Sequence, residues 1–202
     1  MSIREVSMLK VLGATCVLAM ATTQVLAEPH RYEIDPTHTT IAFMVDHIGY
    51  ADTLGVFLEF EGGFTYDMET KELSDVEITV KTASVESFNK ARDDHVRNKD
   101  FLNVEAFPIM TFTAQGGTPQ SETSGTVEGN LSLLDKTQPL VLDVTLNKAE
   151  KYPFGHSRFT LGISARGTVQ RSAFGMTYAV DNGFVGDDVQ LIIETEAMRV
   201  EE

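Results

Sequence analysis

The sequence predicts an all-β, antiparallel barrel or sandwich, and three observations support this class. Short segments rich in Val, Ile, Thr and Phe recur along the chain between turn-forming Gly, Asp, Asn and Pro residues. Within several segments apolar and polar residues alternate with period two, which is the pattern of a strand with one buried face. Most intervals between segments are too short for the helix that joins parallel strands, so we expect antiparallel connections.

Nine segments are expected to form strands. Val76, Ile78 and Val80 share one face of their segment, while the residues between them are charged or polar. Apolar residues at alternate positions from Leu140 to Leu146 repeat this pattern. Strands at such short spacing favour a closed barrel or a sandwich. The expected strands are residues 40–45, 55–60, 62–67, 75–85, 109–115, 126–133, 140–149, 158–169 and 189–197.

One segment, residues 89–103, departs from the strand pattern and predicts a short helix. Asn89 is a favourable N-cap, and Asp93 lies four residues before Arg97, a spacing that pairs opposite charges on a helix. Pro108 disfavours helical backbone in the residue before it, so the helix must end upstream. We therefore expect a helical insertion in a meander of strands.

Residues 1–27 have the three-part layout of a secretory signal peptide. Two basic residues precede the apolar stretch Val11–Ala21, and the small residue Ala27 precedes the expected cleavage point. The apolar stretch is shorter than the roughly 18 residues that indicate a membrane span, and no later segment reaches that length. We expect a secreted protein that does not span the membrane, whose mature chain is one domain, residues 28–202.

The charge of the chain excludes nucleic acid as a partner. The formal net charge is −14 at pH 7, and removal of residues 1–27 makes it more negative by one. A surface this acidic repels nucleic acid and anionic membranes, and no basic stripe offsets it. The single cysteine, Cys16, lies in the signal peptide, so the mature chain must be stabilised by packing and not by disulfides.

The histidines do not form a catalytic or metal-binding motif. His95 follows Asp94, but adjacent residues of a helix point in different directions, which is unfavourable for an oriented general base. His38 and His47 lack the close spacing typical of zinc sites. The chain also lacks a nucleophile elbow and a glycine-rich phosphate loop. We therefore expect no catalytic residue, no metal and no cofactor.

Twelve phenylalanines and no tryptophan are spread over the expected strands. They can form a packed core, or they can line a cavity, because an antiparallel barrel of about eight strands has room for one small apolar ligand. The pattern alone leaves both interpretations open.

Six segments of the mature chain together carry a resemblance to a known family. In order, they are YEIDPTHTTIAFMVDHIGY, GVFLEFEGGFTYD, RDDHVRNKDFLNVEAFPIMTF, VEGNLSLLDKTQPLVLDV, ISARGTVQRSAFGM and VGDDVQLIIETEA. These segments resemble the YceI-like family of secreted bacterial polyisoprenoid-binding proteins. The resemblance implies an eight-stranded antiparallel, lipocalin-like β-barrel with a helical insertion near residues 89–103. It also implies a long apolar pocket for an isoprenoid quinone or a polyprenyl phosphate, and a periplasmic location.

Strand alternation within the implied barrel gives a set of pocket residues. One face of each strand points inward, and a register error of one residue would invert that face. Four side chains of the helical insertion are expected at the pocket rim as headgroup contacts: Lys90, Arg92, His95 and Arg97. The expected apolar pocket residues are Phe43, Val45, Phe57, Ile78, Val80, Phe112, Leu131, Leu142, Val144, Phe159, Leu161, Ile163 and Leu191.

The first functional hypothesis is binding or carriage of an isoprenoid lipid without catalysis. A neutral quinone is favoured slightly over a phosphate, because the excess of carboxylates opposes an anion. The second is an enzyme that acts on such a lipid with His38, His47 or His95 as acid or base. The third is a filled barrel that serves as an interaction module. A homodimer is also considered.

Overall fold

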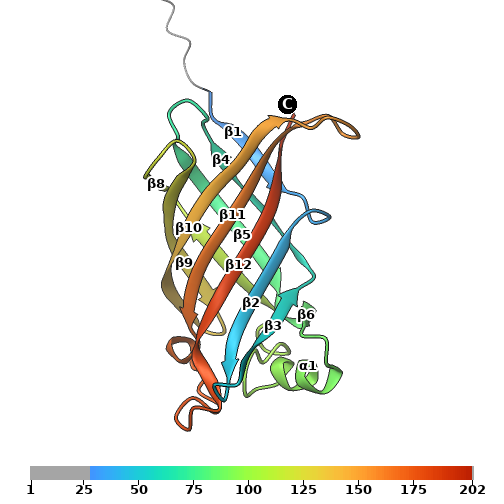
Figure 1. Ribbon diagram of the computed structural model, residues 1–202, viewed down its shortest axis with the longest axis vertical. Helices are drawn as coiled ribbons and strands as arrows, with labels where there is room; N and C mark the ends of the chain where they lie inside the picture. Colours follow the sequence, from blue (N-terminus) through green and yellow to red (C-terminus); the bar gives the residue numbers. More distant parts are fainter. Residues whose placement is uncertain (1–27, 202) are drawn as a thin grey trace, which may run out of the picture.

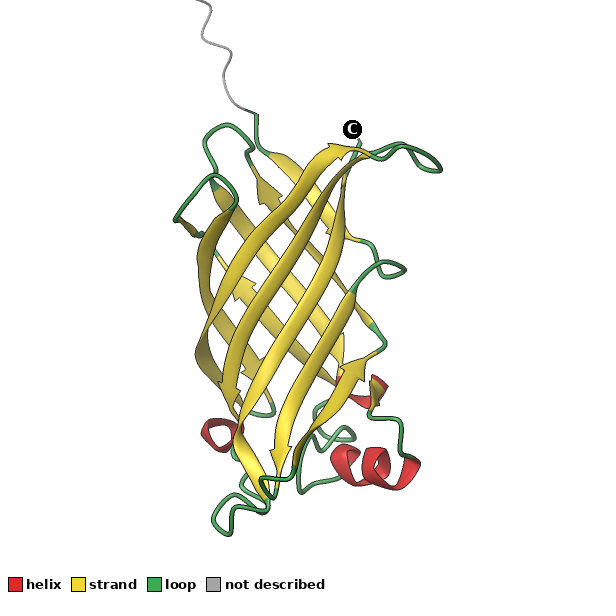
Figure 2. Ribbon diagram, in the orientation of Figure 1, coloured by secondary structure: helices red, strands yellow, loops and turns green. Residues whose placement is uncertain are grey.

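The computed structural model describes residues 28–201. The predicted signal peptide, residues 1–27, lies outside the described residues. Figure 1 shows an elongated barrel whose strands are tilted to its long axis, and Figure 2 shows that nearly all of its wall is strand. Strands tilt in this way whenever a sheet closes on itself.

In the described part of the chain, eight strands form a closed ring. Each pairs antiparallel with the next, and pairing between the last and the first closes the barrel. This confirms the predicted eight-stranded antiparallel barrel. The ring consists of β1 (His30–Ile34), β4 (Phe60–Tyr66), β5 (Leu73–Lys81), β7 (Ile109–Ala114), β9 (Ser124–Leu133), β10 (Lys136–Lys151), β11 (Phe159–Gln170) and β12 (Val185–Arg199).

Three strands continue the wall toward the other end of the barrel. They are β2 (Thr40–His47), β3 (Ala51–Phe57) and β6 (Val85–Glu86). The long strand β12 pairs with β1 near its C-terminus and with β2 over Val185–Glu194, so β1 and β2 follow one another along its edge. β3 pairs with β2 just as β4 pairs with β1. The short β8 (Thr118–Pro119) pairs only with β9.

Each of the nine predicted strand segments overlaps an observed strand. The segment 55–60 covers the break between β3 and β4, where the backbone N–H groups of Leu58 and Glu59 donate to Ser84 Oγ at 3.2 and 3.1 Å. The prediction omitted β1. That strand has only five residues, which is too short for its alternation to be distinct from a loop.

The predicted helical insertion exists but is shorter than expected. Helix α1 spans Lys90–Arg97, and the Asn89 side chain accepts a hydrogen bond from Arg92 N, as an N-cap does. The helix ends at Asn98, whose N–H donates to His95 O and whose side chain accepts from Asp100 N. This second polar cap ends the helix before residue 103. The remaining residues to Phe107 form turns.

On the helix Arg97 lies near Asp94, with Nη1 3.7 Å from Oδ1, in place of the predicted pair with Asp93. Asp93 is buried instead. It is 2% exposed, and its Oδ1 accepts hydrogen bonds from Ser87 N and Ser87 Oγ at 2.7 and 2.5 Å. Burial opposes its ionisation, but the hydrogen bonds from Ser87 outweigh this and hold the pKa of Asp93 below its ordinary value. Asp93 thereby ties α1 to the chain that follows β6.

Helix α1 and the neighbouring turns lie at the lower end of the barrel in Figures 1 and 2. Leu102, which follows α1, is in the same buried cluster as Leu133, Val169, Phe174 and Met176. These side chains fill the interior of the barrel at this end. The interior at this end is therefore a conventional hydrophobic core.

Arg171 is a buried cation in this lower end. It belongs to the 3-10 helix η2 (Arg171–Phe174) and is 3% exposed. Its guanidinium donates to four main-chain carbonyls at 2.7–2.9 Å, those of Met176, Tyr178, Val185 and Gly186. Arg171 therefore joins the start of β12 to the loop that precedes it. Among the described residues, no helix has the length and apolar character needed to cross a bilayer.

Candidate ligand-binding site

The barrel encloses an apolar cavity of about 280 Å³. Its wall consists of inward-facing side chains from the strands of the ring together with β2 and β3. On β11, for example, alternate residues Leu161, Ile163 and Ala165 line it. This volume is close to the lower end of the range of small-molecule pockets.

The burial of the wall residues shows that the interior is hollow. Phe43, Ile78, Phe112 and Leu191 pack against the core cluster but are only partly buried, although they point into the barrel. In a filled interior such side chains would be covered by their neighbours across the barrel. The structure therefore decides between the two interpretations of the phenylalanines in favour of a cavity.

Two glycines give the aromatic rings room at the wall. A Cβ at Gly55 would lie 2.2 Å from Phe43 Cζ, and one at Gly129 would lie 2.5 Å from Phe112 Cζ. Each ring thus lies over a glycine of the adjacent strand. This arrangement keeps two large rings against the wall and leaves the centre open.

Most of the predicted pocket residues line this cavity, and their contact with a ligand stays a prediction. The two that do not are Val45 and Phe159. The lining includes Phe43, Phe57, Ile78, Val80, Phe112, Leu131, Leu142, Val144, Leu161, Ile163 and Leu191.

Val45 and Phe159 have the expected parity but lie beyond the ends of the cavity. Val45 is two residues past Phe43 on β2, where its partners on the neighbouring strands are Thr53 and Val189. Phe159 begins β11 and packs with the second core cluster, which is centred on Tyr32, Leu161 and Ala197. Alternation predicts the side of the wall that a residue occupies, and it carries no information on depth along the barrel axis.

The mouth of the cavity lies at the connection between β7 and β9. Among the described residues of the lining, all that are exposed fall within residues 117–123, and the others are buried or half-buried. This segment includes β8, at the upper left of Figure 1. The sequence analysis missed it, because these loop residues have no periodicity that indicates an inward face.

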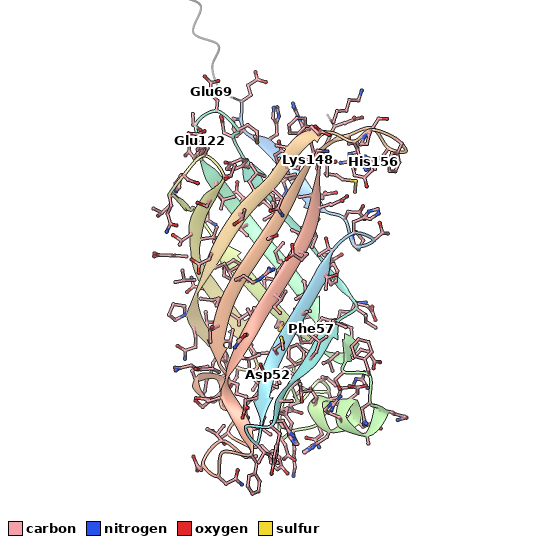
Figure 3. The ribbon with its side chains drawn as sticks, in the orientation of Figure 1. Asp52, Phe57, Glu69, Glu122, Lys148 and His156 are labelled. Carbon is pink, nitrogen blue, oxygen red and sulfur yellow. The ribbon has the colours of Figure 1, made fainter. Side chains whose placement is uncertain are left out.

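An ion pair joins the two sides of the mouth. Lys71, in the turn between β4 and β5, places its Nζ 2.8 Å from Oε1 of Glu122, which precedes β9. The hydrogen bond from Lys71 lowers the pKa of Glu122 below its ordinary value. Figure 3 shows Glu122 at the upper left, beside the turn that carries Glu69. Among the described residues, Lys71 and Glu122 are the charged side chains of the lining.

The four predicted rim residues are not at the mouth, and this corrects the expectation. They lie on α1, at the lower end of the barrel in Figure 1, and none of them is part of the described lining. Lys90 pairs with Asp94, and His95 Nε2 lies 3.1 Å from Asp100 Oδ2. Arg92 donates to Ser87 O, and Arg97 donates to Ala83 O and Val85 O. The sequence shows the charges of this helix, but it does not show which end of the barrel the helix covers.

The three candidate catalytic histidines also lie outside the described lining. His38 Nδ1 is 2.8 Å from Asp35 Oδ2, and this hydrogen bond raises the pKa of His38 above its ordinary value. Asp35, His38 and Glu196 bring one potential metal-ligand atom each within 4.8 Å of one another. Both oxygens of Asp35 already have partners, Thr37 and His38, so the group closes the turn between β1 and β2. The expectation of no bound metal stays a prediction.

A closed antiparallel barrel with an internal apolar cavity defines a protein of the lipocalin-like class. A family model described as a YceI-like domain matches residues 32–197, which is most of the chain. The chain belongs to the YceI-like family. This confirms the resemblance inferred from the sequence segments.

Curated relatives match over nearly their full length. A UPF0312 protein of Pectobacterium carotovorum is 34% identical, and the match covers 93% of this chain and 95% of the relative. The YceI protein of Salmonella arizonae is 31% identical, with coverage of 93% and 96%.

Solved structures share the fold at lower identity. Burkholderia cenocepacia BcnA superposes with a TM-score of 0.72 at 22% identity, covering 82% of this chain and 99% of that one. A polyisoprenoid-binding domain from Saccharophagus degradans, implicated in plant cell wall breakdown, gives a TM-score of 0.60 at 11% identity, with coverage of 84% and 98%.

Proposed function

We propose that the protein binds an isoprenoid lipid in the barrel cavity and carries it through the periplasm without changing it chemically. The observation that carries this proposal is a hollow apolar interior whose lining becomes polar and exposed at residues 117–123. Burial of a hydrocarbon gains about 0.8 kcal/mol for each CH₂-sized group removed from water. The closed barrel offers a cavity formed in advance, so little binding energy is spent on ordering the protein.

Two further observations support the choice of ligand and compartment. The Saccharophagus degradans domain that shares this fold is described as polyisoprenoid-binding. Residues 1–27 have the pattern of a secretory signal peptide. The predicted homodimer stays a prediction.

Binding without catalysis is favoured by where the candidate catalytic histidines lie. General acid–base chemistry requires a group within hydrogen-bond reach of the reacting atom. His38, His47 and His95 are outside the described lining of the cavity. An isoprenoid chain lying among the aliphatic and aromatic wall residues would meet no histidine there.

Lipid extraction tests this proposal directly. The full-length chain is expressed in a bacterial host, the mature protein is purified from the periplasm, and its organic extract is analysed by mass spectrometry. An isoprenoid quinone or polyprenyl phosphate near one molecule per protein is expected. An extract without isoprenoid would contradict the proposal, and recovery of an altered isoprenoid would favour the enzymatic alternative.

A pair of neighbouring variants shows whether the cavity is the binding site. Leu142 is 8% exposed and lines the cavity, whereas Val141 beside it on β10 is 49% exposed and points outward. Leu142→Asp places a carboxylate in the apolar interior and should abolish lipid retention, while Val141→Asp should retain the lipid. Circular dichroism checks that both variants fold. Equal retention by two folded variants would place the lipid elsewhere.

A further inference from the structure

The position of the mouth determines where the headgroup of a bound amphiphile must lie. An apolar tail in the cavity leaves its polar end at residues 117–123, where the lining becomes exposed. Lys71 is the cationic side chain of the described lining and is close to this segment through its ion pair with Glu122. A headgroup at the mouth therefore meets this lysine.

The turn between β4 and β5 holds Lys71 in place. Lys71 N donates to Asp67 O at 2.9 Å, and Asp67 N donates to Glu72 O at 3.0 Å. The buried carboxylate of Asp67 accepts from the N–H groups of Glu69 and Thr70. The backbone of Lys71 is in the left-handed region, with φ 61°. These contacts fix the backbone from which the lysine side chain reaches Glu122 at the mouth.

The two partners of the ion pair differ greatly in exposure. The Lys71 side chain is 25% exposed, whereas that of Glu122 is 91% exposed. Ion pairs with such an exposed member contribute little to stability, because water solvates the carboxylate almost equally well when it is released. In the ion pair, about three quarters of the Lys71 side chain is covered, while Glu122 is almost fully in solvent. The carboxylate is thus an exchangeable counter-ion for a fixed ammonium group.

We propose that Lys71 is the headgroup contact of the cavity, and that an anionic headgroup such as a phosphate ester displaces Glu122 from it. Charge-assisted hydrogen bonds from an ammonium group to phosphate oxygens are short and strong. Glu122 acts as a competing anion: it occupies the lysine in the empty protein and turns outward when ligand binds. This inference rests on the proposed function and specifies its headgroup class. It replaces the sequence-based preference for a neutral quinone.

Two ligands with the same tail test the headgroup contact. Binding of farnesyl phosphate and of farnesol to the purified, delipidated full mature protein is measured by titration calorimetry at low salt. The wild type should prefer the phosphate by roughly tenfold, the size expected for one charge-assisted hydrogen bond. Lys71→Met should remove this preference, so that the variant binds the phosphate no more tightly than the alcohol. Glu122→Gln should strengthen phosphate binding several-fold, because the competing carboxylate is gone.

A second lysine–glutamate pair supplies a matched control. Lys81 Nζ lies 2.7 Å from Glu59 Oε2, both side chains are more than half exposed, and neither lines the cavity. Lys81→Met removes the same charge and should keep the preference for phosphate. Equal affinity of the wild type for both ligands, or a preserved preference in Lys71→Met, would overturn the inference while leaving lipid binding intact. If the wild type bound neither ligand, the proposed function would fail, and this inference with it.

Discussion

Replacement of Arg171 by methionine should destabilise the barrel more than any other single loss of charge discussed above. The side chain is 3% exposed and makes four hydrogen bonds to main-chain carbonyls at the lower end. Methionine has a similar length and fills the space, but it has no donor. The variant therefore separates the loss of hydrogen bonds from the loss of volume.

The magnitude follows from what the substitution leaves behind. Hydrogen bonds to a charged group contribute about 1.5–3 kcal/mol each, and the cost of desolvating the guanidinium offsets part of their sum. The hydrogen bond to Met176 O is buried and that to Val185 O is partly buried, and both carbonyls lose this donor when Arg171 is removed. Breaking a buried charged network in this way costs about 3–5 kcal/mol. This is a large fraction of the stability of a single domain.

Urea denaturation followed by far-UV circular dichroism measures this loss. Arg166→Met is the control, because Arg166 is about half exposed and pairs with Glu194 on the surface of the sheet. Its loss should cost less than about 1 kcal/mol. Arg171→Lys should be intermediate, since an ammonium group is too compact to reach four carbonyls. If Arg171→Met lost no more stability than Arg166→Met, the hydrogen bonds of Arg171 would not stabilise the lower end of the barrel, and this expectation would be refuted.

Two further variants test the wall and the helix. Gly55→Ala places a Cβ 2.2 Å from the Phe43 ring, which must then swing into the cavity, so lipid recovery should fall. Gly162→Ala is the control, because the nearest atom to its added Cβ is 3.8 Å away, and it should leave lipid recovery unchanged. Asp93→Ala removes the acceptor of Ser87 N and should cost about 1–3 kcal/mol at neutral pH by urea denaturation. Because the pKa of Asp93 is lowered in the folded state, its contribution is complete above its ordinary pKa and is lost as the pH falls through the folded value. The gap between wild type and variant should therefore narrow on acidification, and a gap that stayed constant to low pH would contradict this account.

The sequence alone determined which side of the wall most residues face. Side chains of a strand alternate between its faces, so the parity of Leu142 and Val144 follows from local geometry without knowledge of their partners. The cap at Asn89 was predictable for the same reason, since it involves only the next few residues. The shortening of α1 at Asn98 was missed because the predicted end rested on Pro108, whereas the helix already ends where the Asn98 side chain accepts from Asp100 N.

Tertiary structure decided how deep each residue lies and which end of the barrel is open. Phe43 and Val45 share a face of β2, yet only the first reaches the cavity, because other segments fill the lower end. The basic residues of α1 lie at the closed end, while Lys71 and the segment 117–123 form the mouth. Parity repeats every two residues and is the same at every height of the barrel. Position along the axis depends on which strands pair and where the closed ring places their turns, and this is a property of contacts between residues distant in the chain.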